Sequence, residues 1–183
     1  FSISEEIEAT GGYLNAYTSR ENTAFYARML AQDTELCLDV LADVLQHSLF
    51  EPEDIEREQT VISQEIAQAE DTPDDVVFTD FQSQAFSGQG LGQSVLGSQQ
   101  TLSNITRENA IAFWQYHYRP DKAILVASGG VDHDAFVKLA ERLFWPDRGE
   151  RGPREMPTGA KYTGGVTLKT RALEQVHTVL GFE

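Results

Sequence analysis

The sequence predicts an α+β domain in which helices are layered against a mostly antiparallel sheet. Segments with apolar residues at helical spacing dominate the 183-residue chain. Two segments of alternating pattern lie close together near the start, as the strands of a hairpin do. Along the chain, two expected strands precede four helices, a strand, a helix and two more strands. This order does not alternate strand with helix, so a strictly alternating α/β sheet is excluded.

The first expected elements are a helix end and a hairpin. Residues 1–9 carry apolar side chains at helical spacing, and Gly11-Gly12 ends that helix because glycine adopts the conformations that a helix C-terminus requires. Residues 13–20 and 23–30 alternate in character and flank a short turn at Glu21-Asn22. This arrangement predicts two antiparallel strands.

Three helices are expected next. Residues 34–47 place several aliphatic side chains on one face. A second helix is expected at 52–71, because the proline that begins this range suits the first turn of a helix. Residues 72–75 contain another proline and two aspartates, which predict a break and a new start. The third helix is expected to continue from there to Phe86.

The second half of the chain combines a glycine-rich loop with further helices and strands. The loop, at 87–98, lacks the glycine spacing of a phosphate-binding loop and no Lys-Ser/Thr pair follows it, so nucleotide binding is excluded. The remaining expected elements are a helix at 106–118, a strand at 123–128, a helix capped by Asp132 that ends at 144, a loop-rich connection at 146–165, and strands at 166–169 and 176–182.

Composition and charge restrict the function. A chain with 40% hydrophobic and 23% charged residues is typical of a soluble domain with a core. The net charge of −15 argues against nucleic acid and anionic membranes as partners, because both attract lysine and arginine patches. The lone Cys37 excludes an internal disulfide and suits a reducing compartment, and its apolar helix face predicts a buried structural thiol. No apolar run is long enough to span a bilayer.

Glu58 and Glu65 are the most informative pair of residues. No glycine or proline interrupts the stretch from Glu53 to Thr72, so both glutamates belong to one helix. Seven residues are almost two turns, which places the two carboxylates on one face, roughly 20° apart. Like charges at this spacing repel unless a cation lies between them, and a metal ion would supply it. On the spacing alone, two solvated surface acids remain the alternative.

Seven segments carry recognisable patterns in a fixed order. They are GGYLNAYTSRENT at 11–23, EREQTVISQE at 56–65, EDTPDDVVF at 70–78, LGQSVLG at 91–97, HYRP at 117–120, ASGGVD at 127–132 and QVHTVLGF at 175–182. As an ordered set they resemble the N-terminal-type domain of the insulinase/pitrilysin (M16) metallopeptidases, especially the processing-peptidase branch and its bacterial relatives. The resemblance covers nearly the whole chain, with a weak gap at 146–169.

The inverted zinc motif of that family, H-x-x-E-H, is absent from the sequence. It supplies two metal ligands and the general base. The four histidines, none in such a motif, are His47, His117, His133 and His177. By the family's spacing the motif falls roughly a dozen residues before Phe1. We therefore expect 1–183 to be a single M16-like domain truncated at its N-terminus and inactive by itself, with 146–165 as a connection within it and the parent's second domain not present.

The resemblance also implies a metal and its ligands. Glu65 matches the family's third zinc ligand, and Glu58 matches an acid that orients a ligand or a water molecule without binding the metal. One Zn2+ per active site is implied, and only together with the absent H-x-x-E-H segment.

Substrate contacts are implied at two further places. Asn15-Ala16-Tyr17 matches the strand with which family members pair an extended substrate, using the open edge of a sheet; an ordinary buried strand is the alternative. Asp75 matches the first of two acids that read a basic substrate residue. The second position falls at Thr79, which is uncharged, although Asp80 is adjacent.

The leading functional hypothesis is a zinc-dependent endopeptidase of the processing-peptidase type that cuts extended peptides or unfolded protein segments. A second M16 domain or a partner subunit would close the chamber, as in a dimer. The first alternative is a non-catalytic M16-fold partner or scaffold subunit, and the second is an acidic α+β binding module without chemistry. The expected compartment is the bacterial cytoplasm, with the mitochondrial matrix as its eukaryotic counterpart.

Overall fold

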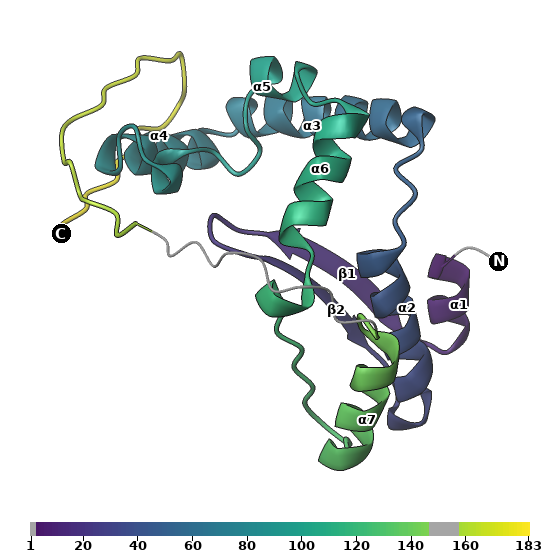
Figure 1. Ribbon diagram of the computed structural model, residues 1–183. Helices are drawn as coiled ribbons and strands as arrows, with labels where there is room; N and C mark the ends of the chain where they lie inside the picture. The colour runs from purple at the N-terminus through teal and green to yellow at the C-terminus, as the bar shows by residue number, and fades with distance from the viewer. Residues whose placement is uncertain (1–2, 147–157) are drawn as a thin grey trace. The chain divides into compact units, whose positions relative to one another are not determined.

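The computed structural model describes residues 3–146 and 158–183, and it has the α+β composition that the sequence predicts (Figure 1). In these two ranges the sheet consists of two antiparallel strands, and no helix is long and apolar enough to cross a membrane. The helices are α1 Ile3–Ala9, α2 Thr34–Gln46, α3 Pro52–Asp71, α4 Pro73–Ala85, α5 Gln99–Ser103, α6 Arg107–His117 and α7 His133–Leu143. The strands are β1 Tyr13–Thr18 and β2 Thr23–Arg28, and short 3-10 helices occupy Ala31–Asp33, Gly90–Gly92 and Pro120–Lys122.

The elements group into two compact units. The first unit contains α1, most of the hairpin, α2, α6 and α7; the second contains the hairpin turn, α3, α4, α5 and the C-terminal segment. Their described residues are 3–17, 23–50 and 107–146 in the first unit, and 18–22, 51–106 and 158–183 in the second. Residues 147–157, which fall in the predicted connection at 146–165, lie outside the described residues. That 1–183 form a single domain stays a prediction.

Helix α2 forms the centre of the first unit. It packs against α7 and β2. The buried apolar side chains of this unit are Ile7, Leu38, Val40, Leu41 and Ala42. Asp132 caps α7, because its carboxylate accepts a hydrogen bond from the backbone N–H of Ala135 at 2.8 Å. The predicted start of α7 is therefore confirmed.

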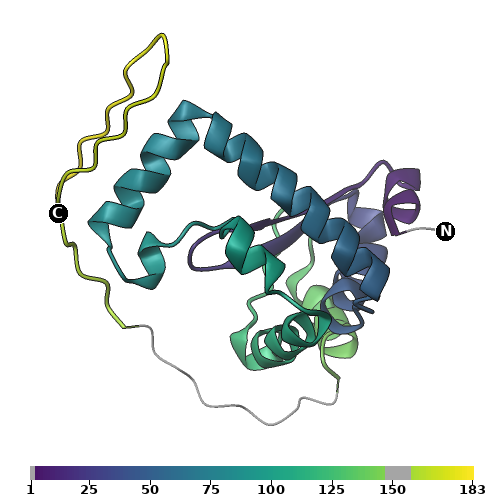
Figure 2. The same ribbon diagram turned by 90° about the horizontal axis from the view of Figure 1, so that it is seen from above.

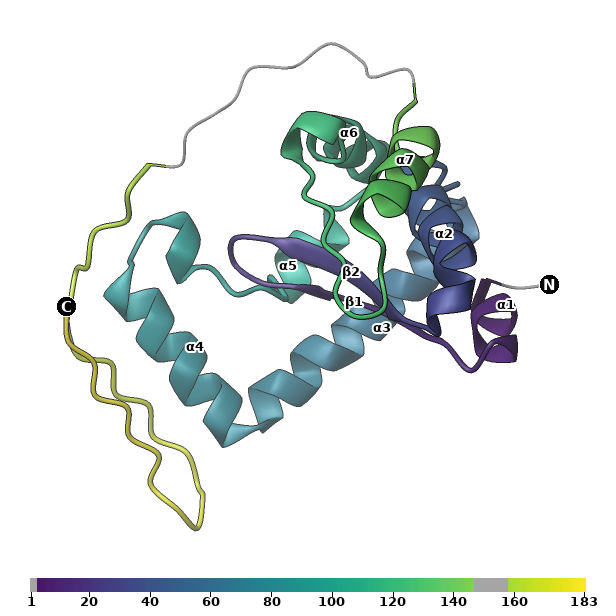
Figure 3. The same ribbon diagram turned by 90° about the horizontal axis from the view of Figure 1, so that it is seen from below.

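Two consecutive helices, α3 and α4, frame the second unit and meet at an angle at Thr72 (Figures 2 and 3). Thr72 is extended, with φ −97° and ψ 107°, and Pro73 opens α4. Proline fits the first turn of a helix but disfavours a helical conformation in the residue before it. The break therefore lies where the sequence predicts it. The buried residues among those described in this unit are Ile66, Ala85, Gly92 and Leu102.

Helix α5 has no counterpart among the sequence predictions. Ser98 and Thr101 form a capping box at its start: Ser98 Oγ accepts a hydrogen bond from the Thr101 N–H at 3.2 Å, and Thr101 Oγ1 accepts one from the Ser98 N–H at 2.8 Å. The Ser-x-x-Thr spacing is a variant of a known helix-start signature. It is the signal by which the sequence could have indicated this helix.

Three predicted strands, at 123–128, 166–169 and 176–182, are wrong. None of these segments is a strand, because none pairs with a neighbouring strand in the part of the chain that the structure describes. An apolar run or an alternating pattern indicates extended chain, whereas a sheet also requires a partner backbone. Apolar side chains of these segments are accordingly exposed, to 91% for Ile124 and 93% for Val176.

The C-terminal segment, 158–183, doubles back on itself alongside α4 (Figure 2). Gln84 on α4 donates a hydrogen bond from Nε2 to the backbone carbonyl of Gly164 at 2.7 Å. Lys169 Nζ lies 2.7 Å from Asp80 Oδ1. Polar side chains of α4 therefore supply a hydrogen bond and an ion pair to this extended segment, which pairs with no strand in the described residues.

Cys37 is half-buried on α2, and burial raises the pKa of its thiol above the ordinary value of 9.0. The folded protein therefore keeps a proton that the unfolded chain releases, so the associated stability is present below pH 9 and is lost as the pH rises through the folded-state pKa. We expect alkylation of Cys37 by iodoacetamide at pH 8 to accelerate several-fold when urea unfolds the protein, because the thiolate is the reactive form. Equal rates in the two states would contradict this.

Candidate metal and peptide-binding residues

Glu58 and Glu65 both lie on α3, and their side chains are exposed. The helix is continuous from residue 52 to residue 71, so the seven-residue spacing keeps the two carboxylates on one face, roughly 20° apart. Neither carboxylate has a hydrogen bond or an ion pair with any described residue. On the same helix, by contrast, Asp54 pairs with Arg57 at 2.8 Å. The two glutamates are therefore open to an external cation.

The described residues do not complete a metal centre by themselves. They contain no group of three or more His, Cys, Asp or Glu side chains that could hold an ion. Two histidines face carboxylates: His47 Nδ1 lies 3.1 Å from Asp43, and His177 Nδ1 lies 2.7 Å from Asp74. Catalytic zinc takes three protein ligands and keeps one position open. Glu65 offers one oxygen donor of the kind that such a set uses, and the described residues do not supply the others.

Strand β1 carries the predicted peptide-binding residues, Asn15, Ala16 and Tyr17, and all three are exposed. The Asn15 side chain donates to the Tyr13 hydroxyl at 2.5 Å and accepts a hydrogen bond from the Ala16 N–H at 2.8 Å. One edge of β1 pairs with β2, and within the described ranges the other edge has no strand beside it. Both the peptide-binding role and its alternative stay predictions. Strand addition by a peptide uses the backbone groups of such an open edge, and here the Ala16 N–H is already bonded to the Asn15 side chain.

Three tyrosines gather around the hairpin. The ring centroids of Tyr13 and Tyr17 each lie 6.2 Å from that of Tyr26 on β2. A hydrogen bond with Tyr13 raises the pKa of the Tyr26 phenol above its ordinary value. The cross-strand position of Tyr26 brings it into this group, and the sequence analysis did not select it. Its signal is the alternation of aromatic residues along two paired strands.

Asp75 lies on α4 with an exposed side chain and no partner in the described parts of the chain. The side chain of Asp80 does not lie beside that of Asp75. The two residues are five positions apart, which places them roughly 140° apart around the helix, and Asp80 is paired with Lys169. At the family's second position, Thr79 is exposed and uncharged. The adjacency of Asp80 in the sequence therefore does not produce a second acid beside Asp75.

The predicted residues are distributed over both units. Glu58, Glu65 and Asp75 belong to the second unit, whereas Asn15 and Ala16 belong to the first. Contacts between distant segments, such as the ion pair of Asp80, are what the sequence analysis missed. They arise from the path of the C-terminal segment along α4, which no local pattern indicates.

Comparison with protein families gives two matches along the chain. The family described as insulinase (peptidase family M16) matches residues 1–99, and the family described as the peptidase M16 inactive domain matches residues 104–183. Together they cover nearly the whole sequence, and the first alone covers more than half of it. The two matches follow one another along the chain, as the seven segments quoted from the sequence do.

Individual relatives agree with these matches. A protein of Rickettsia felis named as an uncharacterized zinc protease is 41% identical over 181 residues, which are 99% of this chain and 43% of that protein. A mitochondrial-processing peptidase subunit beta of Lentinula edodes is 41% identical over 139 residues, which are 76% of this chain and 30% of that protein. The crystal structure of a protease from Helicobacter pylori has the same fold, with a TM-score of 0.78 at 18% identity, covering 85% of this chain and 38% of that one.

The chain spans less than half the length of the curated relatives it matches. The sequence matches nevertheless extend over both units of the structure, and the fold agrees with that of a solved protease. The protein therefore belongs to the insulinase family of peptidases, M16.

Proposed function

We propose that the full protein is a zinc-dependent endopeptidase of the processing-peptidase type. The observation that carries this proposal is Glu65. It is an exposed carboxylate without a partner among the described residues, on the helix where the family's distal zinc ligand is expected. Zinc bound there would polarise a peptide carbonyl and supply a nucleophilic water.

The residues of this chain would position the metal and the substrate. Glu65 would bind zinc and Glu58 would orient a neighbouring ligand or water by hydrogen bonding. The open edge of β1, at Asn15-Ala16-Tyr17, would pair with an extended peptide or an unfolded segment through backbone hydrogen bonds. The remaining ligands and the general base would come from an H-x-x-E-H segment, which is not among these 183 residues.

Asp75 would be the acid that contacts a basic substrate residue. It would act without a second acid, because position 79 is a threonine and Asp80 is paired with Lys169. A single exposed carboxylate contributes modestly to binding. We therefore propose a weak preference for arginine or lysine rather than a strict requirement. A second M16 domain or a partner subunit would complete the chamber, and the lone Cys37 fits a cytoplasmic location.

Removal of the metal tests this proposal. The full-length protein should cleave an unstructured peptide, lose that activity on dialysis against a chelator, and recover it when one equivalent of Zn2+ is added. Mg2+ at the same concentration should not restore activity, because Mg2+ prefers an octahedral set of oxygen ligands.

Two results would contradict the proposal. If the full-length protein contains no zinc and cleaves no peptide, the non-catalytic partner or scaffold subunit becomes the better interpretation. If cleavage persists undiminished in the chelator-treated and zinc-free protein, the chemistry does not depend on a metal and Glu65 has another role.

A further inference from the structure

The C-terminal segment is fixed at its base by uncharged groups. The backbone N–H of Thr163 donates to the carbonyl of Ala85, the last residue of α4, at 2.8 Å. Gln89 donates from Nε2 to the carbonyl of Lys161 at 2.7 Å and accepts a hydrogen bond from the N–H of the same residue at 2.8 Å. Salt does little to hydrogen bonds between uncharged groups, because it screens the interaction of charges. Residues 161–165 therefore form a firm base for the segment.

The chain returns to this base farther along the segment. The hydroxyl of Tyr162 donates to the carbonyl of Gly181 at 3.3 Å. The ring of Phe81 on α4 lies against Gly181, and a side chain at position 181 would clash with it. Glycine permits such a close approach because it has no Cβ. The returning end of the segment is therefore also held by uncharged contacts.

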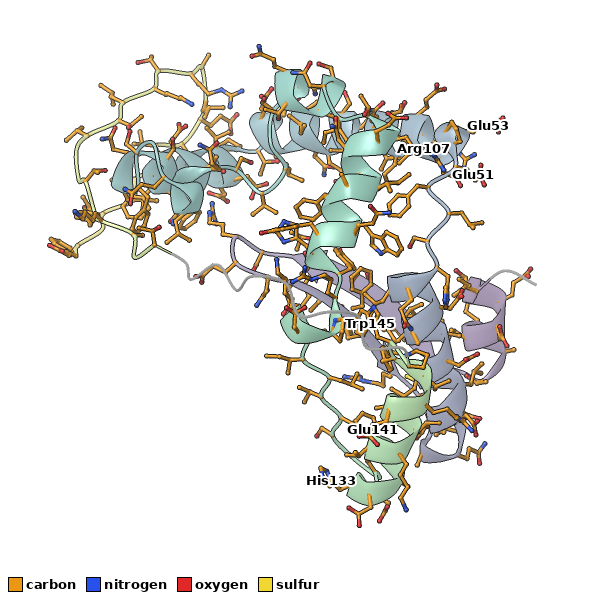
Figure 4. The ribbon with its side chains drawn as sticks, viewed as in Figure 1. Glu51, Glu53, Arg107, His133, Glu141 and Trp145 are labelled. Carbon is orange, nitrogen blue, oxygen red and sulfur yellow. The ribbon has the colours of Figure 1, made fainter. Side chains whose placement is uncertain are left out.

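Between these two anchors the chain runs along α4 as a loop (Figures 2 and 3), and Figure 4 adds the side chains along both. We call residues 168–177 of this loop the flap. Among the described residues, the backbone of the flap has no hydrogen bond with α3 or α4. Its hydrogen bonds and ion pairs with these helices come from basic side chains. The shortest of them, each at 2.7 Å, join Lys169 to Asp80, Arg171 to the backbone carbonyl of Glu70, and His177 to Asp74.

Little apolar surface holds the flap in place. Leu168 is 89% exposed and Val176 is 93% exposed, while Leu173 is 47% exposed. An ion pair between exposed groups shifts an equilibrium by roughly two- to fivefold, and salt screens it. The flap is therefore held less firmly than its two anchors, and by contacts that depend on charge.

We propose that the flap is a conformational device that closes on α4 through its basic side chains and opens when their charges are screened or lose their partners. Closure decides which acids of α4 are available. The closed flap occupies Asp74 and Asp80, so that Asp75 is the one acid of α4 without a partner among the described residues. Opening frees the other two. Every contact involved lies within the second unit, and none requires a metal or the proposed peptidase activity.

Limited proteolysis of the full-length protein with trypsin tests the flap. Trypsin cleaves after lysine and arginine, so the bonds after Lys169 and Arg171 report on the flap and the bond after Lys161 reports on the base. Each rate, measured by mass spectrometry, is divided by that of an unstructured synthetic peptide of residues 158–177 in the same buffer, which removes the effect of salt on trypsin itself. The normalised rate follows the population of the open form when opening and closing are fast. Raising NaCl from about 50 mM to about 500 mM should accelerate flap cleavage roughly fivefold and change cleavage after Lys161 by less than about twofold.

Two variants separate the ion pair from the net charge. Asp80→Asn removes the partner of Lys169 and should accelerate flap cleavage at about 50 mM NaCl by roughly two- to fivefold. Asp75→Asn is the matched control, because it removes the same charge from the same helix at a residue without a partner in the described parts of the chain, and its rate should equal that of the wild type.

Four results would overturn the proposal. Flap cleavage that does not respond to salt would show that charge does not hold the flap, and the absence of cleavage at both flap sites under every condition would show that the flap does not open. Equal acceleration after Lys161 would mean that the whole segment detaches. Equal acceleration by Asp80→Asn and Asp75→Asn would mean that net charge, and not the ion pair with Lys169, determines the rate.

Discussion

Replacing Glu65 with glutamine in the full-length protein is expected to abolish zinc binding and to lower peptide cleavage by more than about a hundredfold. Glutamine keeps the size of the side chain but removes the negative charge that a divalent cation requires. The loss should exceed the roughly 10–100-fold cost of removing residues that only support ligands. Because Glu65 is exposed and has no partner in the described parts of the chain, the free energy of unfolding should change little in the zinc-free state.

Two other glutamates on α3 provide the comparison. Glu56 is exposed on the same helix, and Glu56→Gln should retain both zinc and activity. Glu58→Gln should lie between the two, with a loss of roughly tenfold, because its proposed role is to orient a ligand or water. Zinc content by elemental analysis and initial cleavage rates measure all three variants. Retention of both properties in Glu65→Gln would show that this carboxylate is not a metal ligand and that the zinc is held by other residues.

Replacing Leu38 with alanine is expected to lower the free energy of unfolding by about 3 kcal/mol. Leu38 is 3% exposed at the centre of α2, the helix around which the first unit packs. Truncation removes the transfer free energy of the lost methyl and methylene groups and leaves a cavity that the surrounding helices fill only in part. Urea unfolding followed by tryptophan fluorescence would measure the change, since Trp114 and Trp145 both belong to the first unit.

Leu30→Ala is the control for this substitution. Leu30 is 61% exposed in the same unit, so its truncation should change the free energy of unfolding by less than about 0.5 kcal/mol. A loss of less than about 1 kcal/mol in Leu38→Ala would mean that α2 is not the centre of a packed core. Similar losses in both variants would mean that the exposure of the two leucines does not differ in solution.

Most of the described helices could be predicted closely because their signals are local. Pro52 and Pro73 mark the starts of α3 and α4, and Asp132 caps α7, as expected from residues within one turn of each helix start. The placement of Glu58 and Glu65 on one exposed face follows from the same local geometry. Each prediction required only the 3.6-residue period and the stereochemistry of a few neighbouring residues.

The segments at 123–128, 166–169 and 176–182 were predicted less well for the opposite reason. The continuous apolar run at 123–128 and the patterns of the two later segments indicate extended chain, but a strand exists only when another backbone supplies hydrogen-bond partners. That partner can lie anywhere in a sequence, so a local pattern cannot identify it. Asp80 is a similar case, since its partner Lys169 is 89 residues away.

Apart from α5, the sequence by itself determined where the described helices form, where α3 and α4 break, and that Glu58 and Glu65 lie on one face of a helix, because these properties depend on interactions within one or two turns. The tertiary structure alone decided that Asp80 is paired with Lys169, that Tyr26 joins the tyrosines of β1, and that Arg107 binds the carbonyl of Phe50. These contacts join residues distant in the chain. Their free energy depends on the path of the whole backbone, which no short stretch of sequence specifies.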